Sequence, residues 1–120
     1  MTEQEIFAKY PEIFKEKDLP MEQTCMCWGL EVPDSWLPVI DELCDAITHS
    51  RYIVSGPSGK VNFPQVVATQ VKEKYGDLRF YFRLEYDCKD VPRHIYDQHY
   101  KYVDGMIAYA ERKIYRMKDS

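Results

Sequence analysis

The clearest pattern along the chain is a strict alternation of apolar and polar residues in its middle third. Apolar side chains occupy every second position of one run: Leu78, Phe80, Phe82, Leu84 and Tyr86. A period of two is typical of a strand with one buried face. Gly76 and Asp77 separate this run from a similar one before it, and a two-residue loop that begins with Gly favours a type II′ turn. We therefore predict an antiparallel hairpin over about residues 66–86, with strands at 66–75 and 78–86.

The turn determines which residues of the two strands face each other. With Tyr75 opposite Leu78, one face of the hairpin is almost wholly apolar, and a slip of one residue would expose that face to water. The other face carries six polar side chains: Gln70, Lys72, Lys74, Arg79, Tyr81 and Arg83. Lys74 then lies opposite Arg79, and such a like-charged pair is destabilising in isolation. Glu73 is the charged exception on the apolar face.

The N-terminal residues predict a short helix that is interrupted. Thr2 and Glu5 form a capping-box pattern, which starts a helix at residue 3. Pro11 breaks that helix, and one more helical turn is expected before Leu19.

A second helix is predicted after an irregular segment at residues 18–33, where Pro and Gly punctuate the sequence. Trp28 and Leu30 are expected to anchor that segment to the core. Four apolar residues at helical spacing then predict a helix over about residues 35–48: Trp36, Ile40, Leu43 and Ile47.

Residues 52–54 predict a short edge strand, and residues 55–59 predict a turn or loop. Pro92 suits the first turn of a long last helix, which carries one apolar stripe: Ile95, His99, Val103, Met106, Ala110, Ile114 and Met117. Gly105 lowers the helix propensity there, so a close packing contact is expected at that residue.

Together these elements predict an α+β fold. A small antiparallel sheet, centred on the hairpin, packs against two N-terminal helices and one long C-terminal helix. The chain has 120 residues, the usual size of one domain, and we assign residues 1–120 to a single domain.

Charge and composition narrow the range of functions. The formal net charge is -4, which argues against general nucleic-acid binding, because nucleic-acid binders present a positive surface. Residues 61–120 nevertheless hold eleven Lys and Arg, against five in residues 1–60. No apolar run is long enough to span a bilayer, and the acidic N-terminus lacks the features of a signal peptide. We therefore expect a cytoplasmic protein with reduced thiols.

No residue pattern predicts a metal site, a cofactor or a catalytic centre. Cys25 and Cys27 form a C-x-C pair, whereas zinc sites usually combine C-x-x-C or H-x-x-x-H pairs. Cys44 lies on a helical stripe and is expected in the core, as is a hydrogen-bonded His99. Residues 55–60 lack the spacing of a phosphate-binding loop.

Two stretches of the sequence carry a resemblance to known proteins. One comprises residues 27–31 (C-W-G-L-E), 35–36 (S-W) and 41–44 (D-E-L-C), and the other is residues 70–81 (Q-V-K-E-K-Y-G-D-L-R-F-Y). They resemble the W-G-F-E…G-W…L-C and Q-V-K-E-K-F-G-x-L-R-F-Y motifs of small bacteriophage and prophage proteins with no settled activity. The second motif matches at nearly every position, whereas residues 33–36 depart from the Gly-Asp-Gly-Trp type of turn in the first.

The resemblance implies a viral accessory protein that acts in the cytoplasm of a host cell. Many members of the group end in a further cysteine pair that could hold a metal, and this sequence lacks it, so no metal role is carried over. Accessory proteins of bacteriophages often disarm host defences, either by binding a defence protein or by sequestering a nucleotide signal. This analogy indicates a biological role but no particular ligand or reaction.

The polar face of the predicted hairpin is the leading candidate site. An anion between Lys74 and Arg79 would relieve their repulsion, Arg offers a fork for phosphate, and Tyr81 offers a ring for stacking a base. We expect a non-catalytic accessory binding protein that holds an anionic, nucleotide-like ligand or an acidic partner there. The alternatives are a solvated polar face and internal ion pairs with acidic residues of the second helix: Asp41, Glu42 or Asp45.

Two other functions stay open. An oligomeric interaction module would inhibit a host protein without a small ligand, through tyrosines of the last helix: Tyr96, Tyr100, Tyr109 and Tyr115. A small nucleotide hydrolase would need a water-activating base, and Glu73 is the candidate for that role. The simpler interpretation of Glu73 is a carboxylate that reaches water at the end of the sheet.

Overall fold

The structure is a computed structural model that describes residues 1–54, 63–87 and 89–117. Its helices are α1 (Glu3–Lys9), α2 (Leu37–Val54) and α3 (Arg93–Met117), with three short 3-10 helices η1 (Lys15–Asp18), η2 (Met26–Trp28) and η3 (Asp34–Trp36). Its strands are β1 (Leu30–Glu31), β2 (Gln65–Lys74) and β3 (Asp77–Glu85). The loop predicted at residues 55–59 and the thiol of Cys88 lie outside the described residues.

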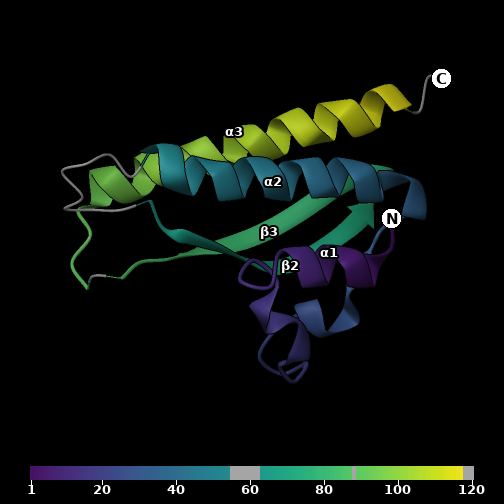
Figure 1. The fold of residues 1–120 in the computed structure, drawn as a ribbon, viewed down its shortest axis with the longest axis horizontal. Helices are drawn as coiled ribbons and strands as arrows, with labels where there is room; N and C mark the ends of the chain where they lie inside the picture. Colours follow the sequence, from purple (N-terminus) through teal and green to yellow (C-terminus); the bar gives the residue numbers. More distant parts are fainter. Residues whose placement is uncertain (55–62, 88, 118–120) are drawn as a thin grey trace.

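The α+β fold class is confirmed, and the sheet is centred on the β2–β3 hairpin. The strand order is β1-β2-β3, with β2 antiparallel to β3 and β1 parallel to β2. The sheet is therefore mixed, whereas we predicted an antiparallel one. In Figure 1, α2 and α3 run side by side in opposite directions along the top of the molecule, while α1 lies below them.

The hairpin turn is one residue earlier than predicted. Lys74 pairs with Asp77, so the loop is Tyr75-Gly76. Both loop residues have positive φ, 55° and 81°, as a type I′ turn requires. The Glu73 carboxylate accepts a hydrogen bond from the Gly76 amide at 2.6 Å, which supports this turn from outside the loop.

Between the turn and residue 70, the error in the turn leaves the two faces of the hairpin as predicted. Moving the turn by one residue moves each cross-strand partner by two, and the side-chain period of a strand is two. Val71 accordingly faces Phe80 on the buried side, and Lys72 faces Arg79 on the other. A bulge between Ala68 and Gln70 interrupts the register further along β2. Beyond the bulge, the apolar Val67 lies on the other face, opposite Arg83.

The N-terminal segment covers the outer edge of β2. The Ala68 amide donates a hydrogen bond to the Ile13 carbonyl at 2.8 Å, and β1 pairs with β2 further along at Leu30 and Val71. The capping box at Thr2 is confirmed, and α1 ends at Lys9, before the proline that was expected to break it.

Residues 52–54 were predicted as a strand, and this prediction is wrong, because they form the last turn of α2. A three-residue apolar run has no periodicity of its own, and the preceding helix continues through it. The last helix was predicted correctly, but Gly105 does not mark a close contact. A Cβ atom added there would meet no atom within 4 Å.

The core lies between the sheet and the long helices. Its largest fully buried side chains come from the helices, from the two long strands and from the segments just before η1 and β2, and they include Phe14, Met26, Ile40, Phe63, Leu78 and Ile114. Trp36 and Leu30 are buried as expected. Within the described residues, no helix is both long and apolar enough to cross a membrane.

Trp28 was expected in the core, but it is 63% exposed. Gly29 has a φ of 76°, and a Cβ atom there would lie 2.4 Å from the Glu3 carboxylate. This glycine turns the chain so that Met26 and Leu30 are buried on either side of the exposed tryptophan.

The turn gives a testable prediction about stability. Tyr75 holds a left-handed conformation that costs a β-carbon residue about 1 kcal/mol, and its side chain is 87% exposed. Tyr75→Asn should therefore raise the free energy of unfolding by about that amount, because Asn tolerates positive φ. Gly76→Ala should lower it by about 1 kcal/mol. Urea unfolding curves measure both, and a less stable Tyr75→Asn variant would show that the ring contact with Lys74 outweighs the strain.

Candidate ligand-binding face of the hairpin

The face of the hairpin turned away from the buried side chains carries the six predicted site residues. Successive cross-strand pairs, which we call rungs, place Lys74 beside Asp77, Lys72 beside Arg79, and Gln70 beside Tyr81. Neighbouring rungs on one face are about 7 Å apart along a strand. Beyond the bulge, Arg83 faces the buried Val67. We call the Lys72–Arg79 and Gln70–Tyr81 rungs the hairpin face.

The central rung brings two cations together. Lys72 lies directly opposite Arg79, where we had predicted Lys74. Within the described part of the chain, neither side chain takes part in an ion pair. Glu31 of β1 pairs with Lys72 on the other side, and Arg79 is near enough to Glu111 to lower the pKa of that carboxyl, against the larger, opposing effect of burial. The rung is thus a like-charged pair that has Glu31 beside Lys72 in register, but no ion pair with it among the described residues.

Lys74 is separate from this pair. It lies on the turn rung opposite Asp77, and its ammonium is 5.8 Å from the centre of the Tyr75 ring. The predicted direct contact between Lys74 and Arg79 is therefore not present.

Arg83 is already bound by acids of the same molecule. Its Nε donates to Glu16 at 2.7 Å, and its Nη1 donates to Glu85 at 2.9 Å. Glu16 is only 7% exposed, and the hydrogen bond to it raises the pKa of Arg83. The alternative of internal ion pairs is thus correct for Arg83, although the partners differ from those expected.

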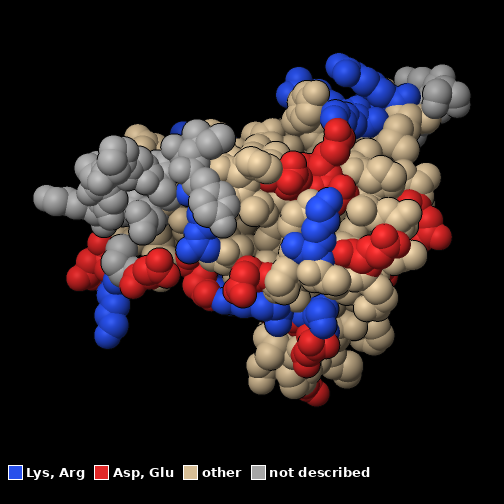
Figure 2. Space-filling view, viewed as in Figure 1, with Lys and Arg blue, Asp and Glu red and all other residues tan. Residues whose placement is uncertain are grey.

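The acids expected as internal partners are engaged elsewhere. Asp41 pairs with Lys9 at 3.0 Å, and Glu42 pairs with Lys113 at 2.7 Å. Asp45 lies 3.5 Å from His49. Figure 2 shows the result on one face of the molecule, where acidic and basic side chains are interleaved and a basic cluster stands out at the C-terminal end of α3.

A shallow cavity of about 570 Å³ adjoins the hairpin face. Gln70, Tyr81 and Arg83 line one side of it, and the N-terminal segment supplies the other with Glu16, Gln23, Thr24 and Cys25. The Tyr81 ring is 46% exposed. The hairpin face therefore places an open aromatic ring and an amide at the edge of this cavity, with the two cations on the neighbouring rung.

Sequence reasoning missed the N-terminal wall of this cavity. Glu16 lies in a run of alternating charges that looks like a solvated helix surface, and Thr24 in a segment without periodicity. Their positions depend on long-range contacts, such as the bond from the Thr24 hydroxyl to the Thr69 carbonyl at 3.3 Å. No local signal in the sequence indicates them.

The other candidate residues have structural roles in the described fold. Glu73 is exposed at the turn, and Cys44 is fully buried, with a pKa that burial raises. His99 accepts or donates a hydrogen bond with the Tyr86 hydroxyl at 2.7 Å, and burial lowers its pKa. Among the residues that the structure describes, no three His, Cys, Asp or Glu side chains are grouped as a metal site requires.

Comparisons with protein-family models, with curated proteins and with solved structures found no match for this chain. The resemblance to the bacteriophage group therefore remains a prediction from two motifs. The stronger motif, residues 70–81, covers the hairpin turn and five of the six predicted site residues.

The ion-pair network around Arg83 predicts a pH dependence of stability. Lys15, and to a smaller extent Arg83, lowers the pKa of Glu85 below its ordinary value. Glu85 therefore stabilises the fold above the pKa of an unfolded glutamate, about 4.3, and this contribution is lost as the pH falls through the folded pKa.

Glu85→Gln should accordingly be less stable than the unmodified protein at neutral pH, and equally stable at about pH 2. Urea unfolding at the two pH values measures the difference. Asp90→Asn serves as the control, because Asp90 is exposed and without an ion pair among the described residues. If Glu85→Gln were less stable than the unmodified protein by the same amount in acid as at neutral pH, the assigned ion pairs would be contradicted.

Proposed function

We propose that this protein is a non-catalytic binding protein that holds an anionic, nucleotide-like ligand on the hairpin face. The observation that carries the proposal is the Lys72–Arg79 rung, two cations directly opposite each other without an ion-paired acid in the described structure. Like charges on facing positions destabilise a sheet. A bound phosphate or carboxylate would convert that cost into two charge-assisted hydrogen bonds.

The neighbouring rung supplies the second half of the recognition. Tyr81 offers a stacking surface for a base, and Gln70 offers both a donor and an acceptor for its edge. The two rungs are about 7 Å apart, a separation comparable with that between the phosphate and the base of a nucleotide. The adjoining cavity leaves room for the rest of such a ligand.

Arg83 has a supporting role in this proposal. Its guanidinium holds Glu16 and Glu85, so it fixes the cavity wall and does not meet the ligand with a free charge. Lys74, one rung away at the turn, contributes long-range attraction. The ligand contacts are therefore assigned to Lys72, Arg79, Gln70 and Tyr81.

The biological role that fits such a protein is sequestration. The resemblance to bacteriophage proteins suggests a viral accessory protein in the host cytoplasm, and a binding protein without catalytic groups acts by lowering the concentration of a free ligand. A counter-defence role follows if that ligand is a nucleotide signal of the host. An acidic surface of a host protein is the alternative ligand of the hairpin face, because it carries the same negative charge.

The test is a charge reversal on the central rung. In Lys72→Glu/Arg79→Glu, binding of ATP and AMP, measured by calorimetry, should fall at least about 100-fold, since each charged hydrogen bond contributes about 1.5–3 kcal/mol. Native mass spectrometry of protein purified from cells gives a second measurement, in which a bound small molecule should be present and should be lost from the variant.

The matched control is Lys101→Glu/Arg112→Glu, which changes the same charge on exposed positions of α3. It should bind as the unmodified protein does. Reversal of Arg83 is avoided, because it would leave the buried Glu16 without its cation and unfold the cavity wall. Unchanged binding in the Lys72/Arg79 variant would rule out the hairpin face as the site.

A second candidate function is favoured by a groove between α2 and α3. This groove of about 760 Å³ has an apolar floor that includes Leu43, Ala46 and Met106, and Tyr102 and Tyr109 rise at its side. Tyr102 is 47% and Tyr109 is 56% exposed. Exposed tyrosines beside an apolar groove are typical of protein interfaces, which keeps the oligomeric interaction module as the rival.

Not all tyrosines of α3 are available for the oligomeric interface of this second candidate function. Tyr96 is half-buried and stacks against Tyr100, which in turn stacks against Phe82. These rings belong to the contact between α3 and β3. Tyr109 lines the groove, and Tyr115 is 62% exposed near the end of the helix.

If the groove is an oligomer interface, Tyr102→Ser/Tyr109→Ser should convert an oligomer into a monomer without loss of helix content. Native mass spectrometry and circular dichroism measure the two properties. A monomeric mass for the unmodified protein would remove the homo-oligomer from consideration, and nucleotide binding by both forms would separate the groove from the hairpin face.

A further inference from the structure

The side of α3 that faces away from the core carries a row of cations and small residues. Lys101, Gly105, Ala108, Arg112 and Arg116 follow one another at steps of four, three, four and four residues, which places them on one face of a helix. All are exposed except the half-buried Ala108, and the buried residues of α3 lie on the opposite face. We call these five residues the outer stripe.

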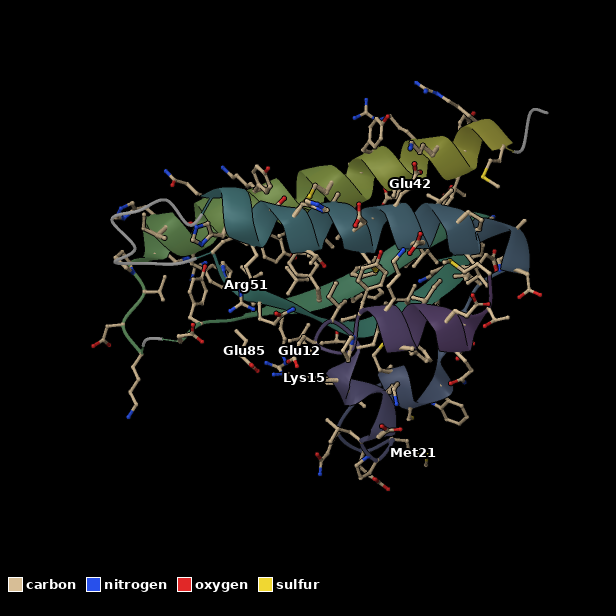
Figure 3. All side chains as sticks on the ribbon, in the orientation of Figure 1. Glu12, Lys15, Met21, Glu42, Arg51 and Glu85 are labelled. Atoms are coloured by element: carbon tan, nitrogen blue, oxygen red, sulfur yellow. The ribbon has the colours of Figure 1, made fainter. Side chains whose placement is uncertain are left out.

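The three cations of the outer stripe have no acidic partner. Among the residues that the structure describes, no ion pair involves Lys101, Arg112 or Arg116. Lys113, beside the stripe, is instead paired with Glu42 of α2 at 2.7 Å, and Figure 3 shows Glu42 at the contact between the two helices. The charge of the stripe is therefore available to a partner, and its C-terminal half lies in the basic cluster that Figure 2 shows at that end of α3.

The middle of the outer stripe lacks side chains that would hold a partner away. Gly105 is exposed, and a Cβ atom there would meet no atom within 4 Å. Its φ is not positive, so neither packing nor backbone conformation requires a glycine, although glycine lowers helix propensity. Together with Ala108 it lets a second helix come close, because the distance between packed helices depends on the side chains at the contact.

The spacing of the cations fits the repeat of another helix. Along α3, Lys101 is about 16 Å from Arg112, and Arg112 is about 6 Å from Arg116. A partner helix has the same rise per residue, so acids at its positions i, i+4 and i+15 lie opposite these cations when it runs antiparallel to α3. Tyr102 and Tyr109 flank the stripe on its α2 side and are 47% and 56% exposed. They offer apolar surface to the same helix.

Charge excludes a second copy of this chain as the partner of the stripe. A two-fold contact centred between Gly105 and Ala108 would place Lys101 beside Arg112 of the second copy, and this pair would occur twice. A parallel two-fold contact would place each cation beside itself. Like charges brought together at an interface cost free energy, so the stripe requires a partner with negative charge.

Acids on both sides limit the stripe to the width of one helix. Asp104 and Glu111 lie on the side of α3 toward β3, where Arg79 and Asp104 both influence the pKa of Glu111. Glu42 and Asp45 lie on the α2 side. A nucleic-acid duplex is wider than one helix, and its phosphates would meet these acids. A narrow acidic polypeptide avoids them.

We propose that the outer stripe binds an acidic amphipathic α-helix of another protein. Its carboxylates would meet Lys101, Arg112 and Arg116, and its apolar residues would cover Tyr102 and Tyr109. The inference rests on the second candidate function, because it names the partner of the surface beside the α2–α3 groove. It is independent of the hairpin face.

The probe is an acetylated, amidated and fluorescently labelled peptide of about 22 residues, long enough to form a helix. It is built from Ala, Gln and Leu, with Glu at positions i, i+4 and i+15. One comparison peptide has Gln in place of each Glu, and another has the three Glu moved to the opposite face. The probe should bind about tenfold more tightly than either, as three exposed ion pairs allow. Fluorescence anisotropy measures the affinities, and the difference should shrink in about 1 M salt.

Two variants separate charge from shape. Arg112→Glu should weaken binding of the probe about fivefold, whereas Lys89→Glu, the same change at an exposed residue outside α3, should leave it unchanged. Gly105→Gln alters no charge and should raise the midpoint of thermal unfolding, because glutamine has the higher helix propensity. It should nevertheless weaken the probe, because its side chain fills the middle of the stripe.

Three results would overturn the inference. The first is equal affinity of the probe and its Gln counterpart, or of Arg112→Glu and the unmodified protein for the probe. The second is a DNA duplex that binds more tightly than the probe and is lost in Arg112→Glu, which would assign the stripe to nucleic acid. The third is a dimer of the unmodified protein that Gly105→Gln converts into a monomer. Nucleotide binding is measured separately, so its failure leaves these results intact.

Discussion

The ion pair between Glu16 and Arg83 is the interaction on which the rest of the site depends. Glu16 is only 7% exposed, and a carboxylate buried to that extent is costly without a hydrogen-bonded cation. Its bond to Arg83 joins residues 67 positions apart in the sequence and fixes η1 against the strand that follows the turn. Because of this bond, the N-terminal segment forms a wall beside Gln70 and Tyr81, and the outer face of the hairpin becomes a groove in place of a flat surface.

The same pair decides which cations remain available to a ligand. Arg83 is held by two carboxylates, and a ligand would have to displace a buried one of them to reach it. Lys72 and Arg79 have Glu31 and Glu111 as acidic neighbours but form no ion pair with either among the described residues, and exposed pairs of that kind contribute little, about 0–1 kcal/mol. The available positive charge is therefore concentrated on one rung. The sequence suggested a diffuse basic surface over the entire hairpin. The ion pairs of Arg83 restrict the available charge to a smaller part of it.

Periodic features of this chain could be predicted, and features set by distant contacts could not. Between the turn and the bulge, the two faces of the hairpin were predicted correctly despite the wrong turn, because a one-residue shift of the loop preserves a period of two. The bulge, which places Val67 opposite Arg83, was not predicted. The long stripe of α3 was equally clear. In contrast, β1 has two residues and no period, and its place beside Val71 depends on a parallel contact far along the chain. Trp28 is exposed because Gly29 turns the backbone, and the burial of Glu16 depends on Arg83. Composition indicates neither of these outcomes.

Neighbouring polar residues extend from the end of α2 to the wall of the cavity beside the hairpin face. Arg51 binds Gln65, which faces Glu85 across the sheet. Glu85 binds both Lys15 and Arg83, and Arg83 also binds Glu16. Figure 3 shows Arg51, Glu85, Glu12 and Lys15 in one region of the molecule. Coupling between sites nevertheless requires an element whose two states the ligands bind differently. Lys15 binds Glu85 and shares no partner with the Lys72–Arg79 rung in the described structure, and substitutions without shared partners usually act additively. Substitutions of Lys15 and of the rung should therefore combine independently in their effects on ligand binding, and a departure from additivity would point to Glu85, the residue that binds both Lys15 and Arg83.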